Sequence, residues 1–255
     1  MVFKDKQIKC NLSVRKALSI INLLAEHEDY ISLTEISSSL GLTMSTAHHI
    51  VTSLKLDRFV DQNPNTKKYG IGLRLYEIGL ANNYYHMLSK KAGPVLDSLS
   101  TKTGESANLA VLIDGQITYI AQRQSSHMMK TFVQLGKRSP VHCTGVGKVL
   151  ISEHTKTELE NIINDHGLKK YTSRTITTLE GLMDELEQIR ENGYAIDLEE
   201  REEGVVCIAA PVYSISRKIV AAISISGPAG RINALNFTDI NKLLTEHAEL
   251  LSNSP

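Results

Sequence analysis

The chain has 255 residues, of which 42% are hydrophobic and 22% are charged. Its formal net charge is zero and its pI is about 7.1. These values exclude a uniformly basic nucleic-acid binder, so any contact with nucleic acid must come from a local surface. The length allows one large core or a small core and a larger one, and we expect two domains.

Cysteine usage and the opening stretch indicate the compartment. Cys10, Cys143 and Cys207 lie far apart without a C-x-x-C pair, which argues against a zinc knuckle and a disulfide framework. The opening stretch MVFKDKQIKCN lacks the apolar region of a secretory signal, and no run of about 18 uncharged apolar residues predicts a membrane span. We therefore expect a soluble protein of the reducing cytoplasm.

The first predicted element is a helix with Ser13 as its N-cap. Its apolar residues recur at helical spacing and predict a one-sided stripe: Val14, Ala17, Leu18, Ile21 and Leu24. A second, short helix follows, because Ser32 and Glu35 form an S-x-x-E capping box. Gly41 stands where this helix needs a left-handed residue to end.

The third predicted helix begins within residues 43–45 and has two contrasting faces. One face is apolar and is expected to be buried: Ala47, Ile50, Val51 and Leu54. The other carries hydroxyls and imidazoles instead of the lysines and glutamates of an ordinary solvated face: Ser45, Thr46, His48, His49, Thr52 and Ser53. Small polar side chains let a helix lie deep in a DNA major groove and hydrogen-bond base edges and phosphates.

A basic hairpin is predicted after this helix. Residues 59–71, FVDQNPNTKKYGI, have two β-prone arms around the turn NPNT, and Lys67 and Lys68 stand at its exit. Together with the three helices it predicts a winged helix-turn-helix whose lysines contact phosphate. The alternative is a three-helix packing unit in which the third helix is merely polar.

These motifs resemble, in order and spacing, the winged helix-turn-helix of the isocitrate lyase regulator (IclR) family of bacterial transcription factors. The resemblance rests on SVRKAL at 13–18, LTEI at 33–36, GL at 41–42, ST at 45–46, FV at 59–60 and YGIGL at 69–73, and it continues over nearly the whole chain. Family members carry proline and lysine after the Gly-Leu pair and arginine in mid-helix, where this chain has Thr43, Met44 and His49. Because two fixed charges are missing, we expect weaker phosphate attraction from this helix.

The connector between the domains is predicted to be helical. Apolar residues within 75–99 keep a helical period that Gly93-Pro94 interrupts, which predicts a linker helix, a bend and a first helix of the next domain. Because a palindromic operator requires two-fold symmetry, we expect the linker to pack on its copy in a homodimer or homotetramer. The predicted organisation is a winged helix-turn-helix at 1–72, a linker helix at 73–91 and an effector-binding and oligomerisation domain at 92–255.

The second domain mixes strands with helices. Strands are predicted at 108–113, 116–121, 130–135, 194–197, 205–211 and 220–226, with an Asp114-Gly115 hairpin turn between the first two. T-x-x-E boxes at Thr155 and Thr177 predict helices that end at Gly167 and Gly193, and a last helix is predicted at 238–251. The pattern indicates an α+β fold, and the family resemblance implies a GAF-like domain whose sheet carries a small-molecule pocket on one face.

Residues 140–150, PVHCTGVGKVL, place small residues at a predicted helix start, where free backbone N–H groups favour an anion such as a carboxylate. The alternative is tight packing at Gly145 and Gly147. In relatives, two backbone amides and four side chains hold the effector. The resemblance carries these roles to Gly145, Val146, Asp197, Cys207, Ser224 and Ser226.

Ser224 and Ser226 stand two apart on one predicted strand, so both face the same side and are expected to contact the ligand. The alternative for Asp197 is a solvated turn carboxylate. If Asp197 lines the pocket, it favours an effector with one carboxylate and hydroxyl or keto groups, such as a keto or sugar acid. Met128 and Met129 provide either an adaptable pocket wall or ordinary core.

The predicted function is a ligand-responsive regulator, a repressor of a catabolic pathway, that binds double-stranded operator DNA, senses a small organic acid and uses no cofactor. Effector binding is expected to alter the placement of two winged domains through residues 73–100. An enzyme would need Cys207 as nucleophile with His142 or His127 as base, but Cys207 lies in an apolar run typical of an inert thiol. The remaining alternative is a redox-responsive regulator using Cys143 and Cys207, or a metal-responsive one that adds His142.

Overall fold

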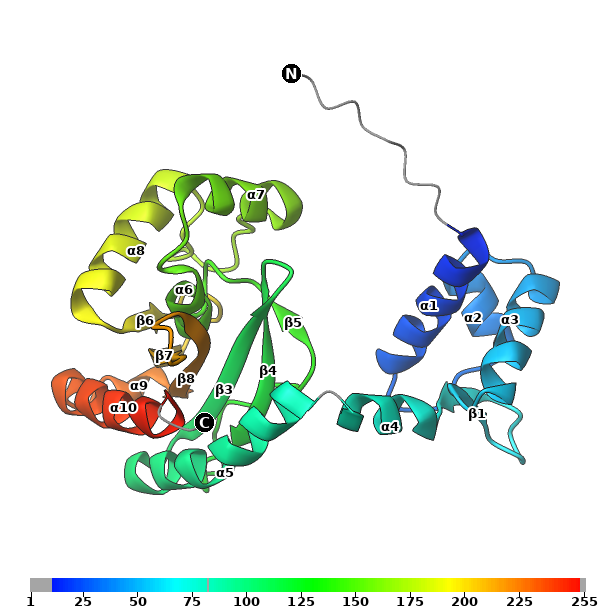
Figure 1. Cartoon of the computed structure of the whole chain (residues 1–255), viewed down its shortest axis with the longest axis horizontal. Helices are drawn as coiled ribbons and strands as arrows, with labels where there is room; N and C mark the ends of the chain where they lie inside the picture. The colour runs from blue at the N-terminus through cyan, green and yellow to red at the C-terminus, as the bar shows by residue number, and fades with distance from the viewer. Residues whose placement is uncertain (1–10, 82, 253–255) are drawn as a thin grey trace, which may run out of the picture. The chain divides into compact units, whose positions relative to one another are not determined.

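The computed structural model describes residues 11–81 and 83–252. They form two compact units that divide between Asn83 and Tyr84 (Figure 1). Cys10 lies outside the described residues. Within the two described ranges, no helix is long and apolar enough to cross a lipid bilayer.

The N-terminal unit contains the predicted three helices and hairpin. Its elements are α1 (Leu12–Ala25), α2 (Leu33–Ser39), α3 (Met44–Leu56), β1 (Val60–Gln62), β2 (Tyr69–Ile71) and α4 (Leu73–Ala81). β1 and β2 pair antiparallel. The buried core joins α1, α2, α3 and the hairpin through Ile20, Leu24, Ile36, Ala47, Val51 and Val60. The helix-turn-helix therefore has a core of its own.

The helix ends in this unit confirm one predicted cap and correct another. In α2, the capping box of Ser32 and Glu35 is present in both directions, and Gly41 has the left-handed φ of +59°. The N-cap of α1 is Asn11 and not Ser13, because the Asn11 side chain accepts the backbone N–H of Ser13 at 3.0 Å. α1 therefore begins one residue before the predicted cap.

The predicted stripe on α1 is wrong in its first half. Val14 and Leu18 are each 54% exposed, whereas Ile20 and Leu24 are buried. Only the C-terminal half of α1 packs on the core of the unit, so helical spacing alone did not identify the buried residues.

The C-terminal unit is built on a six-stranded antiparallel sheet in the order β5-β4-β3-β8-β7-β6. Its strands are β3 (Ser106–Ile113), β4 (Gln116–Arg123), β5 (Arg138–Ser139), β6 (Ala195–Leu198), β7 (Val205–Tyr213) and β8 (Ile219–Pro228). Its helices are α5 (Asn83–Thr103), α6 (Gly145–Ile151), α7 (Lys156–His166), α8 (Leu179–Asn192), α9 (Ala229–Ile232) and α10 (Phe237–Ser252). Figure 1 shows α6, α7 and α8 gathered on one side of this unit and α5, α9 and α10 on the other.

Side-chain alternation gives the two faces of this sheet different characters. On β8, Ile223 and Ile225 point into the core beneath α5 and α10, whereas Ala222 belongs to the core beneath α6 and α8. On β7, Val206 and Ile208 belong to the core beneath α5 and α10, so Cys207 between them points to the opposite face, beneath α6. Bulky β-branched residues thus fill one face, and smaller residues leave room on the α6 face.

The predicted hairpin at Asp114-Gly115 is confirmed, since both residues have positive φ, 49° and 72°, between β3 and β4. The strand predicted at 130–135 is wrong, because this segment is irregular and the next strand is β5. Its Thr131 hydroxyl donates to the Ser226 carbonyl oxygen at 3.0 Å, and its carbonyl oxygen accepts the Ser106 hydroxyl at 3.0 Å. Side-chain bonds, not a strand ladder, therefore fasten this segment to the sheet.

Two helix predictions in this unit also need correction. α5 runs through Pro94 without ending, because Leu96 and Leu99 on the same helix are buried in the core and their packing maintains it despite the missing N–H. The N-cap of α8 is Thr178, one residue after the predicted Thr177, and its hydroxyl accepts the N–H of Gly181. The predicted helix ends at Gly167 and Gly193 are confirmed.

Candidate functional site

The outer face of α3 has the composition that the sequence indicated. Ala47 and Val51 are buried, and Thr46 is half-buried. The polar side chains on the opposite face are exposed: Ser45, His48, His49, Thr52 and Ser53. Thr43 is the N-cap, and its hydroxyl accepts the N–H of Thr46 at 3.2 Å. α3 therefore has a capped N-terminus and a buried apolar face, and it exposes these imidazoles and hydroxyls on its opposite face.

The hairpin is held in shape by side-chain hydrogen bonds. Asn63 Oδ1 accepts the backbone N–H groups of Asn65 and Thr66 at 2.9 and 3.1 Å. Gln62 Nε2 donates to the carbonyl oxygen of Lys67 at 3.0 Å, and Lys55 Nζ at the end of α3 donates to Gln62 Oε1 at 2.8 Å. These bonds tie the wing to α3 and leave the side chains of Lys67 and Lys68 exposed.

A cavity of about 600 Å³ lies on the α6 face of the C-terminal unit. Three of the predicted effector residues line it, namely Asp197, Cys207 and Ser226. Sequence reasoning missed several other lining residues: Tyr119, Thr131, Phe132, Thr144 and Arg201. The residues come from β4, the irregular 130–135 segment, β6, β7 and β8, so the cavity exists only after the sheet has formed.

Gly145, Val146 and Ser224, the other predicted effector residues, are buried and do not line the cavity. A Cβ on Gly145 would lie 3.3 Å from Cys207 Sγ, and a Cβ on Gly147 would lie 2.4 Å from the carbonyl oxygen of Val141. Close packing therefore accounts for both glycines.

One asparagine links the two serines on β8. Asn108 Nδ2 donates to the hydroxyls of Ser224 and Ser226 at 3.2 and 3.1 Å, while Asn108 Oδ1 accepts from Gln122 Nε2 at 2.9 Å. The prediction that both serines face the same side of the sheet is confirmed. Ser226 also hydrogen-bonds the hydroxyl of Thr131 at 2.7 Å, which brings the irregular segment to the cavity.

Asp197 is only 4% exposed, so the alternative of a solvated turn carboxylate is wrong. Its Oδ1 accepts the backbone N–H of Glu200 at 2.8 Å. Burial is the main cause that raises the pKa of Asp197 to about 7, and the charge of Glu200 adds to it. The backbone N–H of Glu200 and the charge of Lys148 act in the opposite direction.

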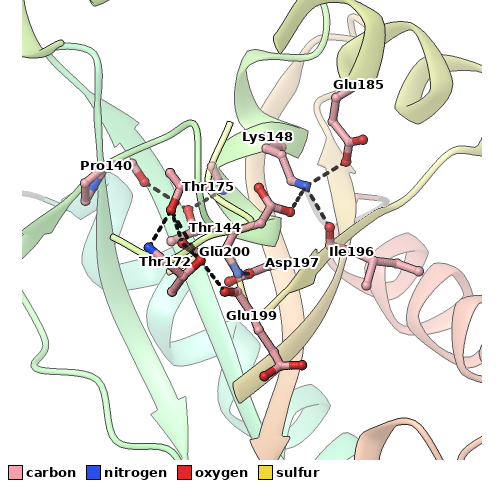
Figure 2. Close-up of polar contacts among 11 residues, drawn as sticks. Pro140, Thr144, Lys148, Thr172, Thr175, Glu185, Ile196, Asp197, Glu199 and Glu200 are labelled. Carbon is pink, nitrogen blue, oxygen red and sulfur yellow. Dashed lines mark hydrogen bonds and ion pairs between the residues drawn. The ribbon is translucent and has the colours of Figure 1, made fainter. Parts of the chain in front are cut away.

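A buried lysine holds the segment that follows Asp197 (Figure 2). Lys148 is 0% exposed, and its Nζ donates to Glu185 Oε1 and Glu200 Oε1, each at 2.6 Å, and to the carbonyl oxygen of Ile196 at 2.7 Å. Burial lowers the pKa of Lys148, but the two glutamates outweigh this effect and raise it. We call Lys148, Glu185, Glu200 and the Ile196 carbonyl the Lys148 clamp.

Two threonines hold the same segment from the other side. Thr175 Oγ1 donates to the carbonyl oxygen of Glu200 at 2.7 Å, and Thr172 Oγ1 donates to that of Glu199 at 2.8 Å. The clamp and the threonines together immobilise the chain between Asp197 and Arg201, both of which line the cavity. The lysine in the small, apolar stretch GVGKVLI was the sequence signal for this clamp.

The cysteines offer no support for the enzyme or redox alternatives. Cys143 and Cys207 are buried free thiols, and burial raises the pKa of each to about 12. His142 Nε2 lies 3.0 Å from the carbonyl oxygen of Lys169, which occupies that nitrogen with a backbone acceptor. The described part of the chain contains no group of three or more His, Cys, Asp or Glu side chains that could hold a metal ion.

Met128 and Met129 are exposed by 102% and 70% and do not line the cavity. Both predicted roles for these methionines, a pocket wall and ordinary core, are therefore wrong. They lie in bends just before the irregular 130–135 segment.

Both units match family descriptions of bacterial regulators. The description "IclR helix-turn-helix domain" matches residues 13–64, and "Bacterial transcriptional regulator IclR C-terminal" matches residues 84–253. The chain is 34% identical to the HTH-type transcriptional regulator XynR of Escherichia coli over 94% of this chain and 95% of XynR. It is 33% identical to the HTH-type transcriptional repressor AllR of Salmonella paratyphi A over 94% of this chain and 88% of AllR.

Solved structures match over both units as well. The IclR protein of Thermotoga maritima is 27% identical, with a TM-score of 0.73 over 94% of this chain and 97% of that one. An IclR homologue of Microbacterium hydrocarbonoxydans in complex with 4-hydroxybenzoate shares the fold, with a TM-score of 0.81 at 22% identity over 92% of this chain and 97% of that one. The chain therefore belongs to the IclR family of bacterial transcriptional regulators and is a DNA-binding regulator, not an enzyme.

Proposed function

We propose that this regulator is a repressor of a catabolic pathway and that a small organic acid controls its binding to a DNA operator. The observation that carries the proposal is the exposed, uncharged polar face of α3 beside a lysine-bearing wing in a family helix-turn-helix. AllR, a relative, is a transcriptional repressor.

Ser45, His48, His49 and Thr52, with Thr46 at the start of α3, are the proposed base-reading residues. Lys67 and Lys68 of the wing are the proposed phosphate contacts. Arginine and lysine are the usual residues for these roles, and because this face of α3 has neither, Lys67 and Lys68 of the wing supply the positive charge beside it. We therefore propose that sequence is read by α3 and that affinity depends strongly on the wing.

The proposed effector site is the cavity at Asp197, Cys207 and Ser226, with Gly145, Val146 and Ser224 packed behind its lining. A second cavity of about 790 Å³ lies between β7 and α10, but none of the buried polar groups of the α6 face reaches it. The Microbacterium homologue binds 4-hydroxybenzoate, which supports a small acid, and a keto or sugar acid remains our preferred class.

We also propose that the chain acts as a homodimer or homotetramer. Apolar side chains of α4 are exposed in the single chain: Leu73, Tyr76, Ile78 and Leu80. Packing α4 against the same helix of a second copy would cover them and supply the two-fold symmetry of a palindromic operator. The effector would then act by changing the placement of two winged units through α4 and α5.

The test of the DNA proposal is selection of binding sites from a random duplex pool with the purified full chain. We expect an enriched sequence with two related half-sites, whose affinity changes when the effector is added. The effector is sought by thermal shift against keto, sugar and aromatic acids, because a bound ligand raises the unfolding temperature. A pool without enrichment, in the presence and absence of these acids, would contradict the proposed function.

A further inference from the structure

Arg201 is a cavity residue that the family resemblance does not assign and that has no ionic partner among the described residues. Other arginines of this unit are paired, for example Arg138 with Asp114 at 2.8 Å and Arg174 with Glu199 at 3.4 Å. Its guanidinium is therefore available to an anion in the cavity.

The guanidinium of Arg201 is held in place without being neutralised. It lies 3.9 Å from the centroid of the Tyr171 ring, a cation–π contact that leaves the edge of the guanidinium open. Tyr171 is fixed in turn, because its backbone N–H donates to Thr175 Oγ1 at 3.0 Å. The Lys148 clamp immobilises Glu200, the residue before Arg201. A side chain positioned before binding loses less entropy when a ligand arrives.

The charge of Arg201 also acts on buried neighbours that do not line the cavity. Burial raises the pKa of Cys143, and the positive charge of Arg201 is the largest influence that lowers it. Arg201 likewise lowers the pKa of His142, although burial is the larger cause there. Lys130 and Lys137 also line the cavity, but they extend from the irregular segment and no aromatic ring among the described residues fixes them.

The inner end of the cavity has the opposite character. Asp197 is buried there, and the neighbouring Lys148 is paired with Glu185 and Glu200. Gly145 is packed against Cys207, and the Gly147 N–H is taken by the Thr144 hydroxyl at 3.2 Å. A ligand carboxylate at this end would therefore lie beside another carboxyl group, Asp197, while Lys148 is already paired with two glutamates and the Gly147 N–H is already taken.

We propose that Arg201 binds the carboxylate of the effector at the exposed end of the cavity and that the end beside Asp197 and Ser226 takes an uncharged polar group. The inference rests on the proposed function, in which this cavity holds the effector. The planar guanidinium suits a carboxylate because it donates two parallel N–H bonds. The site accordingly prefers monocarboxylates that carry a hydroxyl or keto group over the corresponding amides and dicarboxylates.

The experiment measures binding of two matched ligand series to the full chain by calorimetry. One series is gluconate, gluconamide and glucarate, and the other is 4-hydroxybenzoate, 4-hydroxybenzamide and terephthalate. We expect wild-type protein to bind at least one monocarboxylate about tenfold or more tightly than its amide and its dicarboxylate. Arg201→Gln should weaken that monocarboxylate about tenfold and bring the acid-to-amide ratio near one, and Arg201→Lys should restore part of the ratio.

Arg174→Gln is the matched control, because Arg174 is an exposed arginine of the same unit that does not line the cavity. It should keep the wild-type ratio. If a monocarboxylate binds and both Arg201 variants, folded by circular dichroism, keep its preference over the amide, the inference is wrong and the effector site stands. If no probe binds wild-type protein, the acid-sensing proposal and this inference both fail.

Discussion

The outer face of α3 and the Lys148 clamp are both sets of polar groups, but they are built in opposite ways. On α3, Ser45, His49 and Thr52 are exposed along one short helix. In the clamp, Lys148 and Glu200 are buried and hydrogen-bonded across α6 and the segment after β6. The first set is available to a partner outside the chain, whereas the second is bonded inside it, although the buried Glu200 Oε2 has no hydrogen-bond partner among the described residues.

This contrast predicts which substitutions the fold tolerates. Replacing an exposed polar residue of a helix changes the unfolding free energy little, so the effect appears in binding to DNA. Removing one partner of a buried ion pair leaves an uncompensated charge in the core, so the effect appears in stability first. Substitutions in each set and in the wing test this division.

The triple substitution Ser45→Ala, His49→Ala and Thr52→Ala should remove sequence-selective DNA binding. Specific sites are usually favoured over non-specific DNA by about 4–10 kcal/mol, and this margin should collapse while weak, salt-sensitive binding persists. Fluorescence anisotropy with a selected duplex and a scrambled one measures the margin. Ser19→Ala with Asn22→Ala, on the exposed side of α1, is the control and should retain it. A triple variant that is folded and still selective would remove α3 from base reading.

Lys148→Met should destabilise the C-terminal unit by about 3–5 kcal/mol, because Glu185 and Glu200 lose the cation that they share. Urea unfolding measures this change. Adding Glu200→Gln should recover part of the loss. The control is Lys156→Met, whose exposed pair with Glu160 at 3.9 Å should contribute little. Equal effects of the two lysine substitutions would show that the clamp does not stabilise the fold.

Asp197→Asn should flatten the pH dependence of stability. The pKa of Asp197 is raised from 3.8 to about 7 in the folded chain, so the folded state keeps a proton that the unfolded state releases. The stabilisation that this proton gives the folded state is complete below the unfolded pKa. It is lost, at about 1.4 kcal/mol per pH unit, as the pH rises through the folded pKa. Between pH 5 and pH 7 the free energy of unfolding of wild-type protein should therefore fall by about 2 kcal/mol more than that of the variant.

Unfolding by urea at several pH values checks this. The other charged or titratable groups that act on Asp197 or respond to it are Glu200, Lys148, Tyr119, Cys143 and Cys207. Glu200 is the carboxyl group among them, and burial raises its pKa as well. Asp197→Asn and Glu200→Gln must therefore be measured separately. An unchanged slope in the Asp197 variant, with a flattened one in the Glu200 variant, would assign the proton to Glu200.

Lys67→Ala with Lys68→Ala should reduce the salt dependence of DNA binding by roughly two phosphate contacts. The plot of log affinity against log salt concentration gives this number directly. Lys102→Ala with Lys156→Ala removes the same charge from exposed positions of the other unit and should leave the slope unchanged. Equal slopes in the wing variant and wild-type protein would place the wing off the DNA.

Sequence reasoning predicted the helix-turn-helix well because its signals are local. The capping box at Ser32 and the positive φ of Gly41 each depend on a few neighbouring residues. It failed where distant segments decide the outcome. The 130–135 segment has strand-like residues, but bonds from Thr131 to Ser226 and from Ser106 to Thr131 hold it in an irregular form.

The cavity shows the same limit. Asp197, Cys207 and Ser226 were identified only through the family resemblance, and alternation along β8 predicted correctly that its two serines share a face. No spacing in the sequence connects Arg201 with Tyr171, or Lys148 with Glu185, because these pairs form only when separate elements pack.

Asn108 gives the two serines of β8 a fixed polarity. Its amide nitrogen has two protons, and one goes to each serine oxygen, while Gln122 occupies its oxygen. Rotating the amide by half a turn would set its NH₂ group against the NH₂ group of Gln122, so Gln122 favours the orientation in which Asn108 donates to the serines. Each serine must then send its own proton away from Asn108. Ser226 gives its proton to Thr131 Oγ1, because Thr131 gives its own to the carbonyl oxygen of Ser226. The hydrogen bonds from Gln122 through Asn108 and Ser226 to Thr131 therefore all run in one direction, from the sheet to the irregular segment at the cavity.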